Sequence, residues 1–171
     1  MKTINFYESQ KIKPFWITII LILFLAFWLI NVILQIFFNI PLGNHPVSDT
    51  VLVIIGIIPL GFIFLLVFSK LQTNVRSDGV YFKYFPFHFK QKKIGKNEIK
   101  SYSITRYHPI KEYGGWGIRY TLGKKKGRAY NVRGNIGMRF ELKNGKNILL
   151  GTEKPEAFQK AMDDMNHPDN E

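Results

Sequence analysis

The chain has 171 residues, a formal net charge of +12 at pH 7 and no cysteine. The lack of cysteine excludes disulfides, thiolate nucleophiles and cysteine-based zinc sites. Segments 14–48 and 50–69 contain no Asp, Glu, Lys or Arg, and nearly all of the charge follows Ser69. Such a separation of apolar from charged residues is typical of a membrane anchor joined to a soluble domain.

The anchor is predicted to be a transmembrane hairpin, residues 14–68, preceded by an N-terminal segment, residues 1–13. Its first helix, residues 14–38, exceeds the roughly 20 apolar residues that span a bilayer. It is too long for the apolar region of a cleaved signal peptide, which is the alternative. The second helix, residues 51–68, is close to the minimum length and contains two glycines and a proline. A re-entrant loop or a buried core helix is the alternative there.

The turn between the two helices, residues 39–50, contains no Lys or Arg. Basic residues instead flank the opposite ends of the helices: Lys2, Lys11, Lys13, Lys70 and Arg76. The positive-inside rule then places the turn outside and both termini in the cytoplasm. The sequence therefore predicts a multi-pass protein of the inner (cytoplasmic) membrane.

Asn31 and Gln35 are the strongly polar side chains deep in the first helix, and their spacing of four places them on one face. One interpretation is a polar site for transport. We favour a hydrogen bond that pairs the helices of the hairpin or of a dimer, because neither predicted span contains an ionisable residue.

The soluble domain, residues 69–166, begins with β-type alternation. Asp78-Gly79 and Asn144-Gly145 are hairpin-turn signals. About seven short strands are predicted, at residues 80–85, 89–94, 98–108, 116–122, 128–134, 137–143 and 148–150. The period then changes to 3.6 residues, which predicts an amphipathic helix over 153–166 and a polar tail over 167–171. The apolar stripe of that helix consists of Phe158, Ala161, Met162 and Met165.

The predicted fold class is α+β, a transmembrane hairpin followed by a small β-sandwich or barrel that a C-terminal amphipathic helix closes. Seven strands in meander order curl into an orthogonal sandwich whose open corner the helix can plug. This is the layout of pleckstrin-homology-like (PH-like) domains. The segments "KEYGGWGIRY" (111–120), "AYNVRGNIGMRFEL" (129–142) and "ILLGTEKPEAF" (148–158) resemble an uncharacterised family of bacterial membrane proteins. That family carries two transmembrane helices and a bacterial PH-like domain, and the resemblance implies no activity.

The residues that could carry chemistry show no catalytic or metal-binding pattern. The four histidines lack metal-ligand spacing, and no serine lies in a G-x-S-x-G motif. The glycine-rich "YGGWGIRY" is followed by a predicted strand, whereas a phosphate-binding loop requires a helix. We therefore expect a non-enzymatic protein without a cofactor or metal.

Two basic clusters stand out in the soluble domain. The first is Lys90, Lys92, Lys93 and Lys96, and the second is Lys124, Lys125, Lys126 and Arg128. A solvated surface is the ordinary explanation. The more specific explanation is contact with anionic lipid head groups, because each basic residue near an anionic surface contributes about 1 kcal/mol of binding free energy. Aromatic residues alternate with lysine in "VYFKYFPFHFKQKK", but a small β core requires the same alternation, so we do not expect nucleic acid as a partner.

The stretch "KEYGGWGIRY" has two interpretations. Its glycines permit positive φ, a bulge or a close backbone approach, so that Trp116 buries its ring and its N–H finds a partner. The alternative is a ligand groove lined by Tyr113, Trp116, Arg119 and Tyr130.

Two functions follow from these features. The first is a membrane-tethered binding or scaffold module that recognises anionic lipids or a protein at the cytoplasmic face. The alternative is an accessory subunit of a transporter or envelope complex, assembled through the hairpin. Either function is compatible with a homo-oligomer.

Overall fold

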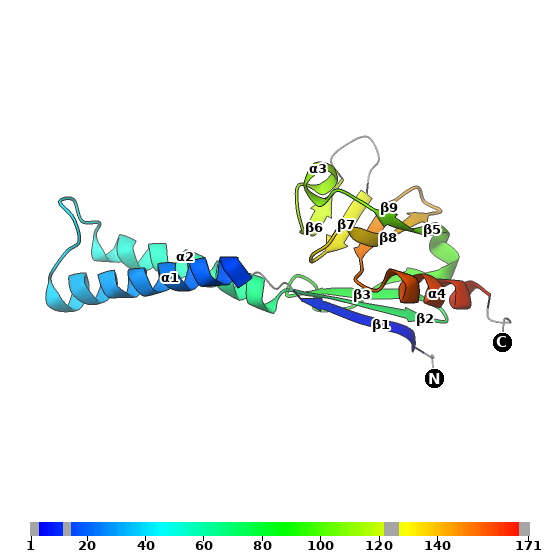
Figure 1. The fold of residues 1–171 in the computed structure, drawn as a ribbon, viewed down its shortest axis with the longest axis horizontal. Coiled ribbons are helices and arrows are strands. Elements are labelled where there is room, and N and C mark those ends of the chain that lie inside the picture. Colours follow the sequence, from blue (N-terminus) through cyan, green and yellow to red (C-terminus); the bar gives the residue numbers. More distant parts are fainter. Residues whose placement is uncertain (1–3, 12–14, 122–126, 168–171) are drawn as a thin grey trace. The chain divides into compact units, whose positions relative to one another are not determined.

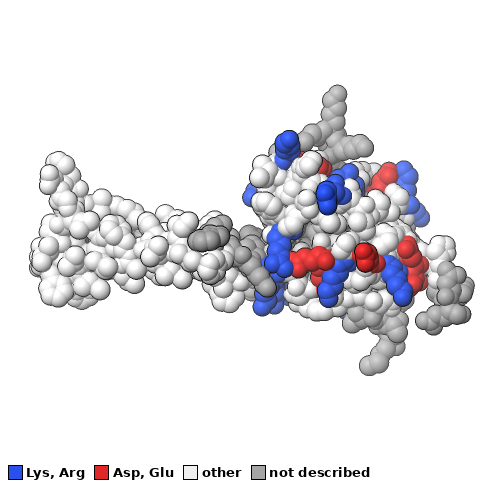
Figure 2. Space-filling view, viewed as in Figure 1, with Lys and Arg blue, Asp and Glu red and all other residues white. Residues whose placement is uncertain are grey.

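The computed structural model describes residues 4–11, 15–121 and 127–167. The chain divides into two compact units. One unit, which we call the β-domain, joins Met1–Ile12 to Ser69–Glu171, and the other, the helical hairpin, is Lys13–Phe68 (Figure 1). On the face drawn in Figure 2, charged side chains lie on the β-domain and none is visible on the hairpin.

The helical hairpin consists of α1 (Phe15–Val32), which continues into a π-helical turn, η1 (Ile33–Phe37), and of α2 (Asp49–Phe68). Among the described residues, one helical segment, Thr18–Phe37, is long and apolar enough to cross a membrane, and none of it is buried inside the protein. Asp49–Leu65 is a shorter apolar helix. The prediction of an apolar first helix is thus confirmed by length and composition.

The two helices of the hairpin interlock where Trp28 packs against Gly56. The Trp28 indole Nε1 donates a hydrogen bond to the Leu52 carbonyl oxygen, at 2.7 Å. A Cβ atom added at Gly56 would overlap the Trp28 ring, whereas one added at Gly61 would meet nothing within 4 Å. Gly56 is therefore the position that lets the bulky indole lie against α2.

The first sheet of the β-domain contains two strands that the sequence pattern did not predict, β1 (Ile4–Lys11) and β2 (Lys70–Arg76). Its order is β1, β2, β3 (Gly79–Phe85) and β4 (Lys92–Gly95), all antiparallel. Lys11 pairs with Lys70, and Lys70 pairs with Phe85. The helical hairpin is therefore an insertion between two directly paired strands.

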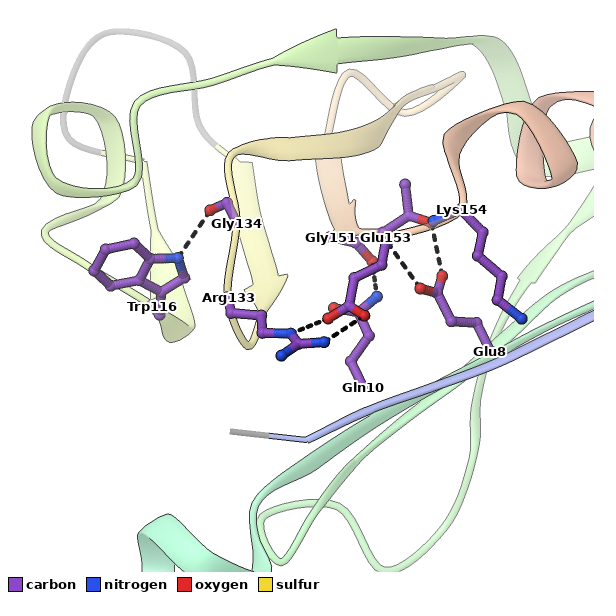
Figure 3. Close-up of polar contacts among 9 residues, drawn as sticks. Glu8, Gln10, Trp116, Arg133, Gly134, Gly151, Glu153 and Lys154 are labelled. Carbon is purple, nitrogen blue, oxygen red and sulfur yellow. Dashed lines mark hydrogen bonds and ion pairs between the residues drawn. The ribbon is translucent and has the colours of Figure 1, made fainter. Parts of the chain in front are cut away.

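Strand β1 has a buried face that contains polar side chains, and these side chains bind it to the rest of the β-domain. Phe6, Glu8 and Gln10 alternate with exposed residues and are all at most 6% exposed. The Glu8 carboxylate accepts hydrogen bonds from Thr152 Oγ1 (2.6 Å) and from the backbone N–H of Glu153 (2.8 Å), and Gln10 Nε2 donates to the Gly151 carbonyl (2.7 Å; Figure 3). A buried carboxylate is tolerated only when its oxygens are hydrogen-bonded, and both oxygens of Glu8 are.

The second sheet follows a short 3₁₀ turn, η2 (Lys96–Glu98). Its strands are β5 (Ile99–Arg106), β6 (Gly117–Tyr120), β7 (Gly127–Asn131), β8 (Ile136–Leu142) and β9 (Asn147–Gly151), with the short helix α3 (Pro109–Tyr113) before β6. The spatial order is β5-β8-β9-β7-β6, and β7 pairs with β9 in parallel. The predicted meander order is therefore wrong, because β5 pairs with β8 and not with β6, and β9 lies between β8 and β7. The described strands number nine rather than about seven, since β1 and β2 add to the predicted set.

Both sheets and the C-terminal helix α4 (Pro155–Asn166) share one apolar core. The predicted stripe is confirmed, since Phe158, Ala161, Met162 and Met165 are all buried. Helix α4 contacts β1 and β2 of the first sheet and β5 and β8 of the second (Figure 1). It therefore closes the side of the core at which these four strands lie.

Phe6 provides a test of the role of β1. Its ring stacks on Phe158 of α4 with 4.9 Å between centroids. We expect Phe6→Ala to lower the free energy of unfolding of the β-domain by about 3 kcal/mol, as for other buried phenylalanines. Unfolding of the full chain in detergent, followed by near-ultraviolet circular dichroism, measures this. Tyr7→Ala, on the exposed face of the same strand, should have little effect, and an equal loss in both variants would contradict the role of β1.

Gly56 provides a test of the hairpin. We expect Gly56→Ala to destabilise the paired helices by about 1–3 kcal/mol, because the new methyl group overlaps the Trp28 ring. Gly61→Ala should be neutral or slightly stabilising, since alanine favours a helix over glycine and meets no neighbour. The temperature at which the helical circular dichroism signal is lost in detergent distinguishes them. Similar behaviour of the two variants would show that the close approach of Trp28 is unimportant.

Candidate functional site

A cleft of about 500 Å³ opens in the β-domain between strands other than the four with which α4 makes its main contacts. It lies where β3 and β4 meet β6, β7 and β9. We call it the basic cleft. Its lining consists of Phe82, Lys92, Lys93, Ile94, Tyr120, Thr121, Gly127, Arg128, Tyr130, Lys146, Asn147 and Ile148. Helix α4 and the basic cleft thus occupy different sides of the same core.

Strand alternation places apolar and basic side chains together in the basic cleft. Ile94 belongs to the core, and Lys92, two residues before it, lies on the same face of β4. Tyr130 likewise belongs to the core, and Arg128 lies two residues before it on β7. The cleft therefore has an apolar floor with cations above it.

Aromatic rings hold two of these cations in place. The Lys92 Nζ lies 5.6 Å from the centroid of the Tyr130 ring, and the Arg128 guanidinium lies 5.0 Å from the centroid of the Tyr120 ring. Tyr120 and Arg128 are direct cross-strand partners of β6 and β7. Such cation–π contacts orient a positive charge without neutralising it.

The basic cleft has a positive potential. Its described lining contains no Asp or Glu, and within the described part of the chain Lys92, Arg128 and Lys146 have no ion-pair partner. The positive charges of the cleft act on the imidazole of His88, whose ring lies 5.6 Å from that of Tyr130. Burial lowers the pKa of His88, and the positive charges of Lys92 and Arg128 lower it further. This arrangement has the charge to attract an anion.

The structure divides the first predicted basic cluster. Lys92 and Lys93 line the basic cleft, but the Lys93 ammonium forms an ion pair with Asp78 at 2.6 Å. Lys90 is exposed in the β3–β4 connection, and the Lys96 ammonium donates to the Met165 carbonyl at the end of α4 (2.7 Å). Of this cluster, Lys92 alone supplies an unpaired charge to the cleft within the described residues. In the second cluster, Arg128 lines the cleft, and the predicted residues Lys124, Lys125 and Lys126 lie outside the described residues.

Of the four residues predicted to line a groove, Tyr113 and Tyr130 belong to two different apolar clusters. Tyr113 packs with Tyr107, Ala129 and Leu149 in a separate small cluster, whereas Tyr130 belongs to the main core. Ala129 and Tyr130 are neighbours on β7, so the two clusters lie on opposite faces of the second sheet. Tyr113 and Tyr130 therefore face different sides of the second sheet, and the predicted groove stays a prediction.

The "GGWG" stretch is a conformational element at the start of β6. Gly114, Gly115 and Gly117 all have positive φ, at 70°, 121° and 115°, which favours glycine. The Trp116 Nε1 donates to the Gly134 carbonyl (2.9 Å; Figure 3), and Arg119 Nε donates to the Trp116 carbonyl (3.0 Å). The predicted partner for the indole N–H is found, but the prediction of a buried ring is wrong, since Trp116 is 43% exposed.

The two polar residues of α1 and η1 make different contacts. Gln35 Nε2 donates to the Val47 carbonyl (2.8 Å) and to Asp49 Oδ1 (2.7 Å), at the start of α2. Asn31 Nδ2 donates to the Phe27 carbonyl in its own helix (2.7 Å). Gln35 thus reaches across the hairpin and Asn31 does not, and their proposed role in helix pairing stays a prediction.

The fold and the site define an α+β protein with a basic cleft and an apolar helical hairpin. The chain belongs to the family of unknown function DUF6141, whose model matches residues 2–166. No curated protein and no solved structure matches the chain. The predicted membership of an uncharacterised family is therefore confirmed, and the family itself carries no activity to this chain.

The pKa of His88 tests the potential of the basic cleft. We expect a value below the ordinary 6.5, and we expect Lys92→Gln to raise it, because a positive neighbour is removed. Since the folded-state pKa is depressed, neutral His88 contributes stability above about pH 6.5 that is lost as the pH falls through the folded pKa. Nuclear magnetic resonance titration of the imidazole in the full chain measures the shift. A value at or above 6.5, unchanged in Lys92→Gln, would contradict a positive cleft.

Proposed function

We propose that this protein is a membrane-tethered, non-enzymatic binding module whose basic cleft binds anionic lipid head groups at the cytoplasmic face. The observation that carries the proposal is the cleft itself, in which Lys92, Arg128 and Lys146 surround an apolar floor without an acidic residue in the described lining. Cations that have no carboxylate partner attract anions, and a membrane surface supplies them at high local concentration.

The pairing of β1 with β2 supports a hairpin that crosses the membrane twice. Lys11, before α1, pairs with Lys70, after α2, so both must be on the same side of a bilayer. If α1 crosses, the chain must therefore return before Lys70. Helix α2 has 20 residues, which span about 30 Å at 1.5 Å per residue and match the hydrocarbon core.

Strand β1 also argues against a signal peptide that is cleaved after the apolar helix. Strand β1 precedes the apolar helix, and its Phe6, Glu8 and Gln10 are buried in the β-domain. Cleavage after α1 would remove these residues and expose their partners. The basic residues that flank the helices, Lys11 and Lys70 among the described ones, support a cytoplasmic β-domain.

A PH-like architecture is part of the proposal. Two sheets share one core, and a C-terminal amphipathic helix closes one of its sides. The parallel β7–β9 pair and the strand β1 depart from a seven-strand meander. The term PH-like therefore refers to the two-sheet, helix-closed layout and implies no particular ligand.

The basic cleft lies close to the end of the first sheet at which the chain joins the hairpin. Lys92 pairs with Phe82, and Phe82 is three residues from Phe85, the partner of Lys70. Three residues of a strand span about 10 Å. Along the strand direction, Lys92 is thus about 10 Å from the end of the sheet at which the chain joins the hairpin.

Neutralising the basic cleft tests the proposal. Each basic residue near an anionic group contributes about 1 kcal/mol, so Lys92→Gln/Arg128→Gln should weaken binding of short-chain phosphatidylglycerol by about 2 kcal/mol, or roughly thirtyfold. Isothermal titration of the full chain in a neutral detergent measures the affinity, with phosphatidylcholine of the same chain length as the baseline. The full chain is required because a fragment of residues 71–171 would lack β1.

The matched control removes the same charge elsewhere. Lys111→Gln/Lys160→Gln neutralises two exposed lysines, on α3 and α4, outside the basic cleft. Its affinity should stay near that of the unaltered protein. An equal loss in both pairs would show that net charge, and not the cleft, attracts the lipid.

A further inference from the structure

The connection between β3 and β4, residues 86–91, exposes two phenylalanines. Phe87 is 57% exposed and Phe89 is 80% exposed, although both are large apolar side chains. Neither the proposed membrane hairpin nor the proposed anion site in the basic cleft explains why these two phenylalanines are exposed. Exposed apolar side chains that lie together mark an interaction surface.

The exposure of these phenylalanines is built into the connection. Between them, the His88 backbone N–H donates to the Tyr84 carbonyl at 2.7 Å. The His88 ring packs against Phe82 and Tyr130, at 6.4 and 5.6 Å between centroids. With His88 held against the core, its two neighbours Phe87 and Phe89 are left on the outside.

The connection starts at the end of the first sheet that adjoins the membrane helices along the chain. Phe85, the last residue of β3, pairs with Lys70, and Lys70 pairs with Lys11. Lys11 is the last residue of β1 before the hairpin, and Lys70 follows the last residue of α2 by two positions. Phe87 and Phe89 therefore extend from the edge at which the chain leaves for the hairpin and returns from it.

The charges around the connection match an anionic membrane surface. Lys11 and Lys90 are exposed, and Lys70 Nζ lies 5.7 Å from the centroid of the Phe85 ring. The sequence from Gly79 to Asn97 contains no Asp or Glu. Aromatic side chains beside lysines are typical of segments that lie in the membrane interface.

We infer that Phe87 and Phe89 insert into the interfacial region of the bilayer and form a second attachment of the β-domain beside the hairpin. The inference rests on the proposed membrane crossing of the hairpin. A second attachment restricts how the β-domain can turn on its tether. Because the His88 ring between the two phenylalanines packs against Phe82 and Tyr130, which line the basic cleft, the attachment also holds the cleft near the head groups.

Site-directed spin labelling of the full chain tests the inference, and the absence of native cysteine makes single labels specific. Nitroxides are placed at Phe87→Cys and Phe89→Cys in vesicles of phosphatidylcholine and phosphatidylglycerol. We expect a loss of accessibility to a water-soluble nickel chelate and a gain of accessibility to oxygen. Ile110→Cys, on α3 and 67% exposed, is the control, and it should stay accessible to the chelate.

A fourth label separates this inference from the proposed function. Ile30→Cys lies on α1 and is 55% exposed, so it should be accessible to oxygen and not to the chelate if the hairpin crosses the bilayer. If residue 30 behaves so while residues 87 and 89 behave like 110, the inference alone is overturned. If residue 30 is accessible to the chelate, both fail. Loss of both oxygen and chelate accessibility at 87 and 89 would indicate burial against a second copy of the chain and would also overturn the inference.

Discussion

The pairing of β1 with β2 is the constraint on which the rest of the structure depends. These two strands are neighbours in the sheet, yet the whole helical hairpin separates them in the sequence. Gln10 then binds the last residue of β9, and Glu8 binds the segment between β9 and α4, both more than 140 residues further along the chain. One short N-terminal strand thus joins the beginning of the chain, the strand that follows the hairpin and the end of the chain in the β-domain.

Strand β1 also helps to determine which side of the β-domain core is closed and which side is open. Phe6 stacks on Phe158, so β1 and α4 close one side of the core together. The strands beyond their reach, β3 and β4 in one sheet and β6, β7 and β9 in the other, leave the basic cleft. Since the closing helix carries the apolar stripe, the opposite side can be lined by lysine and arginine without loss of the core.

The sequence patterns identified the elements whose signals are local. Hydropathy predicted α1, the Asp78-Gly79 and Asn144-Gly145 turns predicted two hairpins, and the 3.6-residue period predicted α4 and its buried stripe. Strand β1 gave no such signal, because two of its three buried residues are Glu8 and Gln10, which are buried only through partners far along the chain. The parallel β7–β9 pair is likewise decided by distant contacts.

The candidate site could be predicted only in part for the same reason. Counting lysines along the chain identified Lys92 and Arg128 but gave equal weight to Lys93 and Lys96, whose charges are directed to Asp78 and to the end of α4. Lys146 was missed because it lies outside both basic clusters of the sequence, after the Asn144-Gly145 turn. The fold brings it to the basic cleft. Tyr113 and Tyr130 were assigned to one predicted groove, whereas in the fold they belong to two different apolar clusters.

An inserted hairpin also makes the fold of the β-domain depend on the path of the chain. Strands β1 and β2 can pair only if both ends of the hairpin emerge at one place, and the cost of closing so long a connection is reduced when two packed helices form it. In a bilayer, a chain that crossed once would leave β1 and β2 on opposite sides. Phe6, Glu8 and Gln10 would then lack their partners, and the sheet, the α4 contact and the basic cleft would not assemble. The buried face of β1 therefore couples correct insertion of the proposed anchor to formation of the site that the anchor carries.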